Sequence, residues 1–495
     1  MGKKFWAIDL GTTKSSVAYY NTSLRKGVCC PNEQGSYATP SVVCIYPDGE
    51  KVVGEEARDC AKIYADRTAQ LFKRSIDQKK AYINVDGKDY SAKDLSVVVL
   101  KRMSDYAKEE TGEQIEDVVI TVPAYFDAAA RQAVMDAGKE AGFGKITLLD
   151  EPVAALYNSL SFNNNMNGKN VLIFDFGGGT LDIVLAHVTE DCIDEVLIGG
   201  DPQLGGSDFD KAFEEYISRK FLRNVSLQID EQQELILKTE LAKIALSEKQ
   251  DTRFTVSTPL GRKEIKVNHG EFLEAAAELI TKTKNVVKGI KSEMISKGIT
   301  KVDKVILAGG STNMPWVREY LKKEFAGAEV VGKDVELCVA NGAAVYAKVI
   351  AENRKQKIVQ SFRNNADKIQ TLNRVTGRSY GIAALNDGKA CVYTLIPKNS
   401  TLPAKGKHVF YTKYWGQETA NIKVNETFTS AQKEHIANGK EIGAYELKIK
   451  AKNLPGKSPI SVTLELDENG LLHVQAEELK GRTKVEAKIK TLEAS

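Results

Sequence analysis

Long hydrophobic runs are absent from this 495-residue sequence, and several other features are scarce. The apolar runs, such as Val171–Phe174, are far shorter than the roughly 20 residues that cross a bilayer. The first ten residues include no extended apolar stretch of the kind that a signal peptide needs. Proline is limited to 12 residues and hydrophobic residues make up 42%, which argues against a disordered or collagen-like chain. We therefore expect a folded cytoplasmic protein that binds no membrane.

Cysteine is infrequent and the charge is nearly balanced. The seven cysteines have irregular spacing and no C-x-x-C pair, so we expect reduced thiols rather than a disulfide framework or a zinc site. With 69 basic and 66 acidic residues, the net charge of +3 predicts no nucleic-acid partner. The excess is concentrated from Lys355 onward, where 23 Lys and Arg stand against 14 Asp and Glu. That basic third would suit acidic partners, although a solvated basic surface is the simpler interpretation.

Familiar catalytic motifs are missing too: there is no G-x-x-x-x-G-K-[ST] loop, no H-E-x-x-H and no G-x-S-x-G. What is present is an internal repeat. Residues 5–20 and 170–188 each predict a strand, a Gly/Thr turn and a second strand, and the aspartates before the turns, Asp9 and Asp175, are 166 residues apart. A repeat at this distance indicates a duplicated lobe rather than a solenoid, whose periods are roughly 20–50 residues.

The remaining pattern divides the chain into an α/β part and a β part. Helical segments are predicted over 128–142, from Pro152, and over 208–247, 315–325 and 339–352, among short strands at 117–122, 146–149 and 302–307. The polar stretch 353–378 indicates a linker. Beyond it, short alternating segments separated by Gly, Pro and Asn predict an all-β sandwich or barrel, with strands at 390–396, 408–414, 445–451, 461–467, 471–476 and 484–490.

The second copy of the repeat carries the stronger chemical signal. Within Asp175–Asp182, three successive glycines cost backbone entropy that a plain hairpin does not need, so we interpret them as bare backbone for a polyphosphate. The carboxylates at both ends suit hydrated Mg²⁺, which bridges acidic side chains and phosphates. The first copy, Asp9–Thr13, would pass for a simple hairpin by itself. If the two copies face each other, they would form a phosphate clamp.

Other candidates allow two interpretations each. The Gly-Gly turn after the strand at 305–307 is either a nucleotide contact or a plain turn. Glu240, Lys243 and Ser247 share one helix face, which alone suggests a solvated surface. Glu151 follows a strand end and is an acid–base candidate, whereas Lys73 is by position alone an ordinary surface lysine.

Taken together, these motifs resemble the seventy-kilodalton heat-shock protein (DnaK-type) chaperone family of the actin-like ATPases. The matching stretches are Ile8–Thr13, Val119–Phe126, Arg131–Ala133, Glu151–Ala155, Ile173–Asp182, Leu204–Asp210, Val305–Thr312, Leu395–Pro403 and Val462–Ala476. The resemblance implies an α/β actin-like (ribonuclease H-like) two-lobed ATPase domain followed by an all-β sandwich domain. It places the ATPase domain at 1–355 (lobes about 1–168 and 169–355), a linker at 356–378, and a substrate-binding β domain at 379–495. The family continues into a helical lid, which we expect this divergent chain to lack.

The resemblance also assigns roles to individual residues. It implies Mg²⁺ binding through water at Asp9, Asp175 and Asp182, and catalysis by Lys73, Glu151, Asp175 and Thr180. It implies coupling of nucleotide state to the β domain by Pro123 and Arg131. The implied nucleotide-binding residues are Gly11, Thr12, Thr13, Gly177, Gly178, Gly179, Thr180, Gly205, Gly206, Glu240, Lys243, Ser247, Gly309, Gly310 and Ser311.

By the same resemblance, the function would be that of an ATP-dependent chaperone, a slow ATP hydrolase whose nucleotide state controls the binding of extended peptide. The cofactors would be ATP or ADP with Mg²⁺, and K⁺ is a further candidate. The partners would be unfolded or extended polypeptides, a J-domain co-chaperone and a nucleotide exchange factor, and the chain would be a monomer. One alternative is a nucleotide-binding co-chaperone or scaffold with weak interdomain coupling. Another is a small-molecule kinase, which would have no use for an appended β domain.

The sequence departs from the family pattern at several positions. Asn313 stands where many members carry an arginine beside adenine, and Ile244 lies in the same pocket, so nucleotide affinity is expected to be weaker. The linker segment 367–373 keeps only Ile369 and Leu372 as large apolar residues, which would loosen interdomain coupling. The region between residues 55 and 113 is shorter than usual, and the cleft loop at 383–389 differs.

Overall fold

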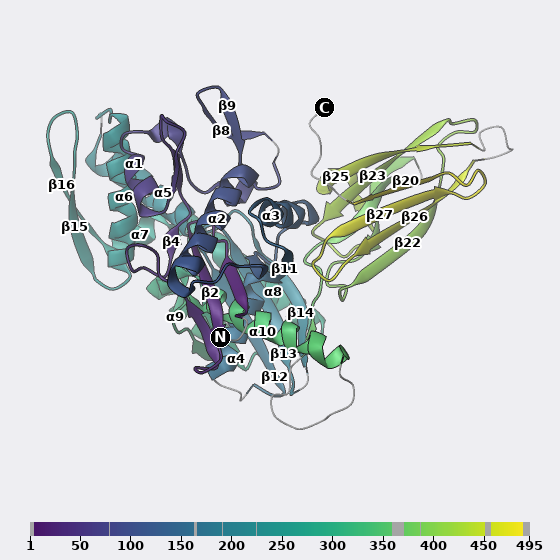
Figure 1. Cartoon of the computed structure of the whole chain (residues 1–495), viewed down its shortest axis with the longest axis horizontal. Coiled ribbons are helices and arrows are strands. Elements are labelled where there is room, and N and C mark those ends of the chain that lie inside the picture. Colours follow the sequence, from purple (N-terminus) through teal and green to yellow (C-terminus); the bar gives the residue numbers. More distant parts are fainter. Residues whose placement is uncertain are drawn as a thin grey trace.

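The computed structural model describes residues 4–78, 80–162, 166–190, 192–223, 225–358, 371–386, 388–450 and 457–488. A two-lobed α/β body is followed by an all-β domain that lies beside it (Figure 1). The predicted fold class is therefore confirmed. Among the described residues, no helix is long and apolar enough to cross a membrane.

The first lobe is built on one sheet whose central strand carries the first Gly/Thr turn at its end. The strand order is β11 (Lys145–Asp150), β10 (Asp117–Val122), β1 (Trp6–Asp9), β2 (Lys14–Asn21) and β3 (Lys26–Cys29), with β4 (Thr39–Pro40) beside β2. Around it lie α2 (Ala92–Thr111), α3 (Ala128–Glu140), α4 (Glu151–Phe162) and a smaller region. That region contains β5 (Val43–Ile45), β6 (Lys51–Val53), α1 (Glu55–Cys60), η1 (Ala65–Arg67), β7 (Thr68–Ala69), η2 (Phe72–Ser75), β8 (Ala81–Val85) and β9 (Lys88–Ser91).

The second lobe repeats this sheet. Its strand order is β18 (Glu329–Val331), β17 (Lys304–Ala308), β12 (Lys169–Phe176), β13 (Leu181–Val188), β14 (Cys192–Asp201) and β19 (Thr371–Asn373). The helices are α5 (Gly206–Phe221), α6 (Ile229–Leu246), α7 (His269–Ala275), α8 (Ala277–Ser296), η3 (Gly310–Asn313), α9 (Pro315–Glu324) and α10 (Cys338–Ile358), with a hairpin of β15 (Asp251–Val256) and β16 (Lys263–Asn268). In both sheets the first strand pairs antiparallel with the second and parallel with a later strand, as duplication predicts.

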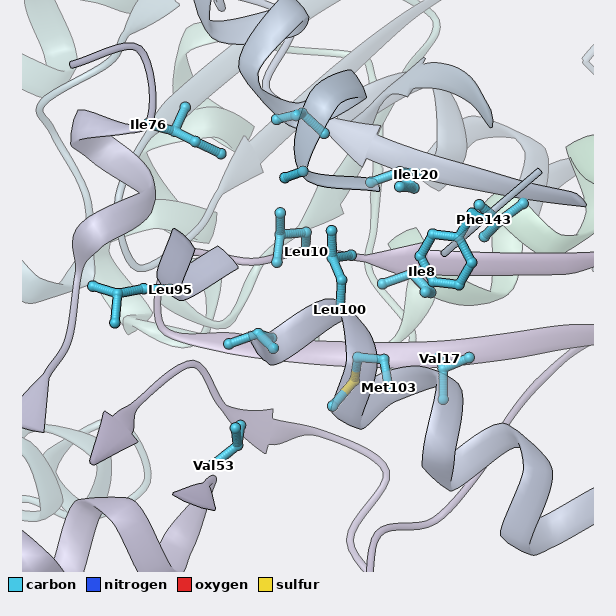
Figure 2. Close-up of a cluster of buried hydrophobic side chains, with 14 of the residues drawn as sticks. Ile8, Leu10, Val17, Val53, Ile76, Leu95, Leu100, Met103, Ile120 and Phe143 are labelled. Carbon is cyan, nitrogen blue, oxygen red and sulfur yellow. The ribbon is translucent and has the colours of Figure 1, made fainter. Parts of the chain in front are cut away.

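Apolar packing explains why each lobe holds its turn rigidly. The first lobe has a core in which side chains from β1, α2 and β10 meet, among them Ile8, Leu95 and Ile120 (Figure 2). A second core extends across both lobes and includes Ala7 from β1 and Ile173 from β12. Such cores are packed about as densely as organic crystals, so a turn at the end of a core strand is held in place.

Helices α10 and α4 join the two lobes at very short range. A Cβ on Gly342 would lie 1.7 Å from the carbonyl oxygen of Ala154, and one on Gly27 would lie 2.0 Å from that of Asn341. Only glycine therefore permits this approach. Close packing between the lobes therefore explains the small residues of α10, which their sequence pattern alone did not.

The β domain consists of two antiparallel sheets. One has the order β24 (Lys433–His435), β21 (Lys389–Ile396), β20 (Ser379–Asn386), β23 (Thr419–Thr427) and β25 (Lys440–Lys448). The other has β22 (Ala404–Tyr411), β26 (Pro459–Leu466), β27 (Leu472–Glu478) and β28 (Lys484–Lys488), and η4 (Ile436–Asn438) follows β24. Val462, Leu464 and Leu466 are buried on one face of β26, as their alternation predicts.

Several sequence-based boundaries were wrong. The helix expected over 208–247 is two helices, α5 and α6, and strands β20 and β23 were not predicted. Within the predicted linker, residues 371–373 form β19, which pairs in parallel with β14; this pairing leaves the predicted limits of the linker untested. Asp367 and Ile369 lie outside the described residues. All seven cysteines carry free thiols, as expected.

Candidate functional site

The two Gly/Thr turns meet face to face where the lobes join. A Cβ on Gly178 would lie 2.2 Å from Oγ1 of Thr13, and a Cβ on Gly179 would lie 2.3 Å from Oγ1 of Thr12. Real Cβ atoms do not approach so closely, so these glycines are needed for the turns to touch. Besides the predicted role of exposing backbone to a phosphate, the Gly-Gly-Gly segment therefore allows the two turns to touch.

Side chains from other elements fix the glycine turn by its carbonyl groups. Ser311 donates to the Gly177 carbonyl over 2.8 Å, and the Ser207 hydroxyl donates to the Gly178 carbonyl over 2.8 Å. Arg74 donates to the Gly179 carbonyl over 2.6 Å and forms an ion pair of 2.6 Å with Asp208. With these carbonyls fixed, the turn is held at three successive residues.

Two further predicted glycine turns close around the same segment. A Cβ on Gly205 would lie 2.5 Å from the Gly178 carbonyl, and one on Gly206 would lie 2.5 Å from the Ser311 hydroxyl. Gly309 has a φ of +80°, which a residue with a side chain rarely adopts, and it lies against the Phe176 carbonyl. Gly11 accepts the Ser41 hydroxyl at its carbonyl over 2.8 Å.

Lys73 is the most unusual lysine at this junction, because it is buried. It lies on η2, its side chain is 2% exposed, and its ammonium is 2.6 Å from Glu151 Oε1 at the start of α4. The Phe126 ring lies 5.5 Å from the same ammonium. Buried lysines require a partner, so the pair is fixed in one geometry. The structure corrects the positional interpretation of Lys73 as a surface residue.

Three aspartates gather near this pair, and two of them, Asp175 and Asp182, are buried. Asp175 and Asp182 are directly opposite across β12 and β13, and Asp9 ends β1, where it accepts the Thr121 hydroxyl over 2.7 Å. Burial and then the nearby Glu151 carboxylate raise the pKa of Asp9 and of Asp182 to about 7. The same two causes, in that order, raise the pKa of Asp175 well above its usual value.

These raised pKa values show that the site gathers carboxylates whose charges a cation would stabilise. The Oδ2 atom of Asp182 is buried without a hydrogen-bond partner, while its Oδ1 accepts the Tyr125 amide over 2.9 Å. A hydrated divalent ion would offset the repulsion among the carboxylates and donate to the free oxygen through its water. The residues present thus fit Mg²⁺. Within the described part of the chain, no group of three or more His, Cys, Asp or Glu is placed to hold a metal directly.

The predicted adenosine residues lie close to the turns, but not all of them line one cavity. Lys243 forms a 2.7 Å ion pair with Asp210 and donates to the Gly206 carbonyl over 3.2 Å. Glu240 lies 3.8 Å from Arg58 of the other lobe. Ser247 lines a cavity of about 410 Å³.

The residues that depart from the family pattern lie at that same cavity or near it. Asn313 lines the cavity together with Ser247, and also a neighbouring one of about 480 Å³ between the lobes. Ile244 is half exposed on α6. Gly310 lies near Glu336, which lines the larger cavity and forms an ion pair of 3.1 Å with Lys14 of the first lobe.

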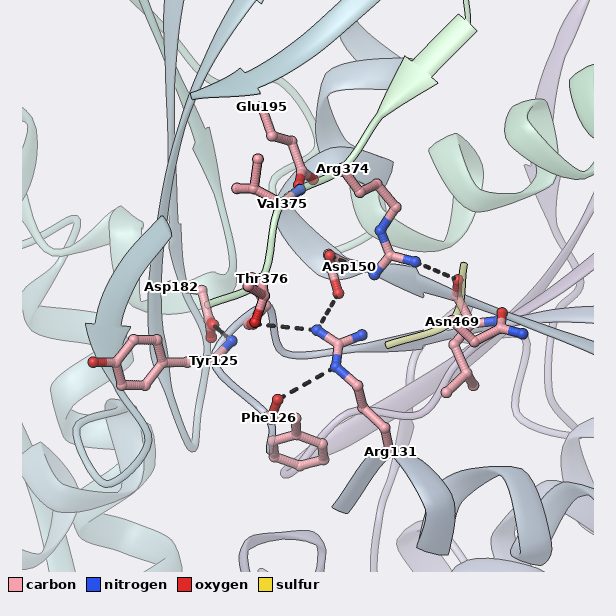
Figure 3. A network of polar contacts seen from close by, with 12 residues as sticks. Tyr125, Phe126, Arg131, Asp150, Asp182, Glu195, Arg374, Val375, Thr376 and Asn469 are labelled. Carbon is pink, nitrogen blue, oxygen red and sulfur yellow. Dashed lines mark hydrogen bonds and ion pairs between the residues drawn. The ribbon is translucent and has the colours of Figure 1, made fainter. Parts of the chain in front are cut away.

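Arg131 lies at the contact between the first lobe and the β domain. Its guanidinium is 2.7 Å from Asp150 Oδ1, and the other oxygen of Asp150 is 2.6 Å from Arg374, just after β19 (Figure 3). Arg374 also donates to the carbonyl of Glu468 over 2.9 Å, and Asn469 accepts the Leu148 amide over 3.1 Å. One buried carboxylate therefore binds two arginines at the domain contact. Asp150 and Arg374 were not predicted from the sequence.

A short path leads from the aspartates to the β domain through the turn after Pro123. The Tyr125 amide donates to Asp182, and the Tyr125 carbonyl accepts Arg378 over 3.1 Å. The Tyr125 ring stacks on Phe428 of the β domain with a centroid distance of 5.6 Å, and the Arg378 guanidinium lies over both rings. Pro123 itself accepts the Phe126 amide over 3.1 Å.

The β domain contains a groove of about 1080 Å³. Residues from both sheets line it, including Ile382, Leu385, Phe410 and Ile422. Leu385 is 51% exposed, so the groove offers apolar surface to solvent. Exposed apolar patches of this kind mark binding sites in soluble proteins.

A comparison with protein-family models agrees with this arrangement. The model described as Hsp70 protein matches residues 6–82 and 75–495, which together span nearly the whole chain. The match includes both lobes and the β domain, in the order in which the structure has them. Members of that family are ATP-dependent chaperones with ATPase activity, and they bind unfolded polypeptides. The chain belongs to the Hsp70 family.

Proposed function

We propose that this protein hydrolyses Mg-ATP slowly at the junction of its two lobes, and that nucleotide state controls binding of extended polypeptide in the β-domain groove. The observation that carries the proposal is the ion pair of the buried Lys73 with Glu151, set beside Asp9 and the buried Asp175 and Asp182 at two facing Gly/Thr turns. Phosphoryl transfer depends on positioning and on neutralising charge more than on covalent help. A buried ammonium and a fixed carboxylate supply both.

Each residue has a distinct task in this proposal. The Lys73 ammonium, held by Glu151 at 2.6 Å, stabilises the charge that develops on the transferred phosphoryl group. Glu151 orients the attacking water, and the Thr180 hydroxyl at the end of the glycine turn positions it. Asp9, Asp175 and Asp182 would hold Mg²⁺ through water, and the ion would supply charge neutralisation for the phosphates; K⁺ is proposed as a further ion.

The nucleotide would occupy the junction itself. Thr12, Thr13 and the amides of Gly177 to Gly179 would bind its phosphates, and the turn at Gly205 and Gly206 would border them. Gly11 lies at the same turn as the two threonines. The adenosine would be bordered by Glu240, Lys243, Ser247, Gly309, Gly310 and Ser311, next to the cavity that Asn313 lines.

The domain division that fits these roles keeps the predicted limits. We propose an ATPase domain over 1–355, a linker over 356–378 and a substrate-binding domain over 379–495. Pro123 and Arg131 would transmit nucleotide state, because their turn contacts Asp182 on one side and the β domain on the other. The partners would be extended polypeptides, a J-domain co-chaperone and a nucleotide exchange factor.

Single-turnover ATP hydrolysis tests the proposal. Lys73→Met should lower the rate constant by at least two orders of magnitude, because it removes a buried charge aimed at the reaction. Lys304→Met is the matched control, since Lys304 is 4% exposed and paired with Glu329 at 3.2 Å but lies on β17 away from the junction. No hydrolysis by the unmodified protein, or equal loss in both variants, would overturn the assignment.

Adding peptide to the same assay separates the chaperone from the co-chaperone or scaffold. Stimulation of hydrolysis by an extended apolar peptide supports a coupled chaperone. A hydrolysis rate that the peptide does not change would instead favour the weakly coupled co-chaperone or scaffold.

A further inference from the structure

The β-domain groove is apolar inside, with aromatic side chains on one wall. Tyr393 stacks on His408 with a centroid distance of 4.3 Å, and Phe410 meets Tyr393 edge to face at 5.7 Å. Leu385 and Tyr411, also in the lining, are 51% and 65% exposed. An extended segment with apolar side chains would cover this surface and remove it from water.

The charged residues of the groove are almost all of one sign. The lining includes four lysines, Lys413, Lys423, Lys433 and Lys457, and a single carboxylate, Glu441. Lys423 and Glu441 form an ion pair of 2.9 Å and offset each other. The groove therefore keeps three positive charges.

None of the remaining three lysines has a carboxylate partner among the residues that the structure describes. Lys433, opposite Tyr393 in the β21–β24 pair, donates to the Asn386 side-chain oxygen over 2.8 Å. The Lys413 ammonium lies 5.0 Å from the Tyr414 ring centroid, and Lys457 is exposed. Their charges thus face the groove and the solvent without compensation.

We propose that the groove selects extended segments whose apolar centre is flanked by acidic residues. The inference rests on the proposed function, because it names the class of peptide that the same groove takes. Apolar side chains would fill the wall formed by Tyr393, His408 and Phe410, and flanking carboxylates would approach the three uncompensated lysines. A segment with basic flanks would meet like charge and only one carboxylate, already paired. Part of the net positive charge in the last third of the chain would thus contribute to peptide binding at this groove.

The expected preference is moderate. An exposed ion pair of this kind changes an equilibrium about 1.4- to 5-fold, so two or three pairs should give roughly a 10-fold difference in Kd. The effect should shrink with salt, because the Debye length falls from ~10 Å at 0.1 M to ~3 Å at 1 M ionic strength. Contacts with the apolar centre should persist at high salt.

Fluorescence anisotropy with the full chain tests this. Three labelled peptides share one apolar five-residue centre of Leu and Val and differ only in flanks of two Glu, two Gln or two Lys on each side. The Glu-flanked peptide should bind roughly 10-fold more tightly than the Gln-flanked one at low salt, and the Lys-flanked one should bind most weakly. Raising the ionic strength to 1 M should bring the three Kd values within about 2-fold of one another.

A charge-matched pair of triple variants locates the effect. Replacing Lys413, Lys433 and Lys457 by Gln should abolish the preference while the Gln-flanked peptide still binds. Replacing Lys407, Lys448 and Lys450 by Gln removes the same charge from exposed positions outside the groove lining, and the preference should remain.

The outcomes separate this inference from the proposed function. Binding of all three peptides with equal Kd, or tightest binding of the Lys-flanked peptide, would overturn the acidic preference and leave peptide binding intact. Equal loss of preference in both triple variants would show a general charge effect and also overturn it. Absence of binding by any peptide would overturn the proposed peptide-binding function, and the inference with it.

Discussion

Replacement of Asp150 by Asn should release the β domain from the ATPase lobes. The Asp150 carboxylate is fully buried and is shared by Arg131 at 2.7 Å and Arg374 at 2.6 Å. The adjacent guanidinium groups lower the pKa of Asp150 against the opposing effect of burial, so the carboxylate stays charged. Asn has nearly the same shape, which limits the change to the charge and to the hydrogen bonds it makes.

The magnitude follows from the burial of both arginines, which are each 7% exposed. Removing one partner of a buried ion pair leaves the other charge uncompensated and costs about 3–5 kcal/mol. Arg374 lies at the start of the chain segment that enters the β domain, so most of that cost falls on docking. The docking equilibrium should shift by two to three orders of magnitude.

Hydrogen exchange at the Leu148 amide reports docking directly. Leu148 lies on β11, the edge strand of its sheet, and its amide donates to Asn469 of the β domain over 3.1 Å. When the domains separate, that edge amide loses its partner and exchanges. In Asp150→Asn its protection should fall about 100-fold, while the Ile120 amide, on the inner strand β10, should change little.

A surface pair supplies the control variant. Lys405 and Glu465 form an ion pair of 3.0 Å on the β domain, with side chains 63% and 52% exposed, so Glu465→Gln should cost at most about 1 kcal/mol. Leu148 protection within 2-fold of the unmodified protein in Asp150→Asn would refute the reasoning. An equal loss at Leu148 and Ile120 would refute it as well, because the first lobe itself would then be unfolding.

Three further outcomes follow from single side chains. Gly178→Ala should abolish tight nucleotide binding by calorimetry, because its Cβ would lie 2.2 Å from Thr13 Oγ1; the added substitution Thr13→Ser, which removes a methyl group, should restore little. Burial raises the pKa of Glu426 from 4.5 to about 8, so the folded state binds more protons than the unfolded one between those values and its stability falls as pH rises. Glu426→Gln should therefore flatten the decrease of Tm between pH 5 and 8, and an unchanged slope would contradict this. Tyr125→Ala should remove peptide stimulation of ATP hydrolysis while leaving the unstimulated rate within about 3-fold, because its ring touches Phe428 but only its backbone amide touches Asp182.

The parts of the fold that could be predicted from sequence are those with local causes. The two strand–turn–strand repeats were recognisable because alternation and glycine placement act within 20 residues, and both copies form as predicted. Alternation on β26 likewise predicted the buried face with Val462 and Leu464. The break between α5 and α6 was missed because both helices have continuous polar, helix-favouring composition, and tertiary packing ends the first near Phe221.

The candidate site likewise combines features that local sequence could predict with features that it could not. The glycine turns were recognisable, but Arg74 carries no local sign that it will bind the Gly179 carbonyl 105 residues away. Arg374 and Asp150 are 224 residues apart, so no pattern within either segment indicates the pair. The sequence suggested a phosphate-binding role for Gly178 and Gly179 but not their contact with the other turn, because the threonines that contact them come from the opposite lobe.

The structure shows what the described part of the altered linker segment 367–373 contacts. Its described residues, Thr371–Asn373, add a short strand to the edge of the second sheet, and Leu372 packs against the core shared by the lobes. One apolar side chain offers little area, roughly 2 kcal/mol at most. Buried arginines follow immediately, with Arg374 on Asp150 and Arg378 3.7 Å from Glu426. Docking through the buried Asp150 pair should therefore weaken only at acidic pH, where Asp150 takes up a proton, and should change little with salt, because ions in solution screen exposed pairs far more than buried ones. Docking through a leucine-rich linker would behave differently, because its strength would depend on the apolar area that the linker buries.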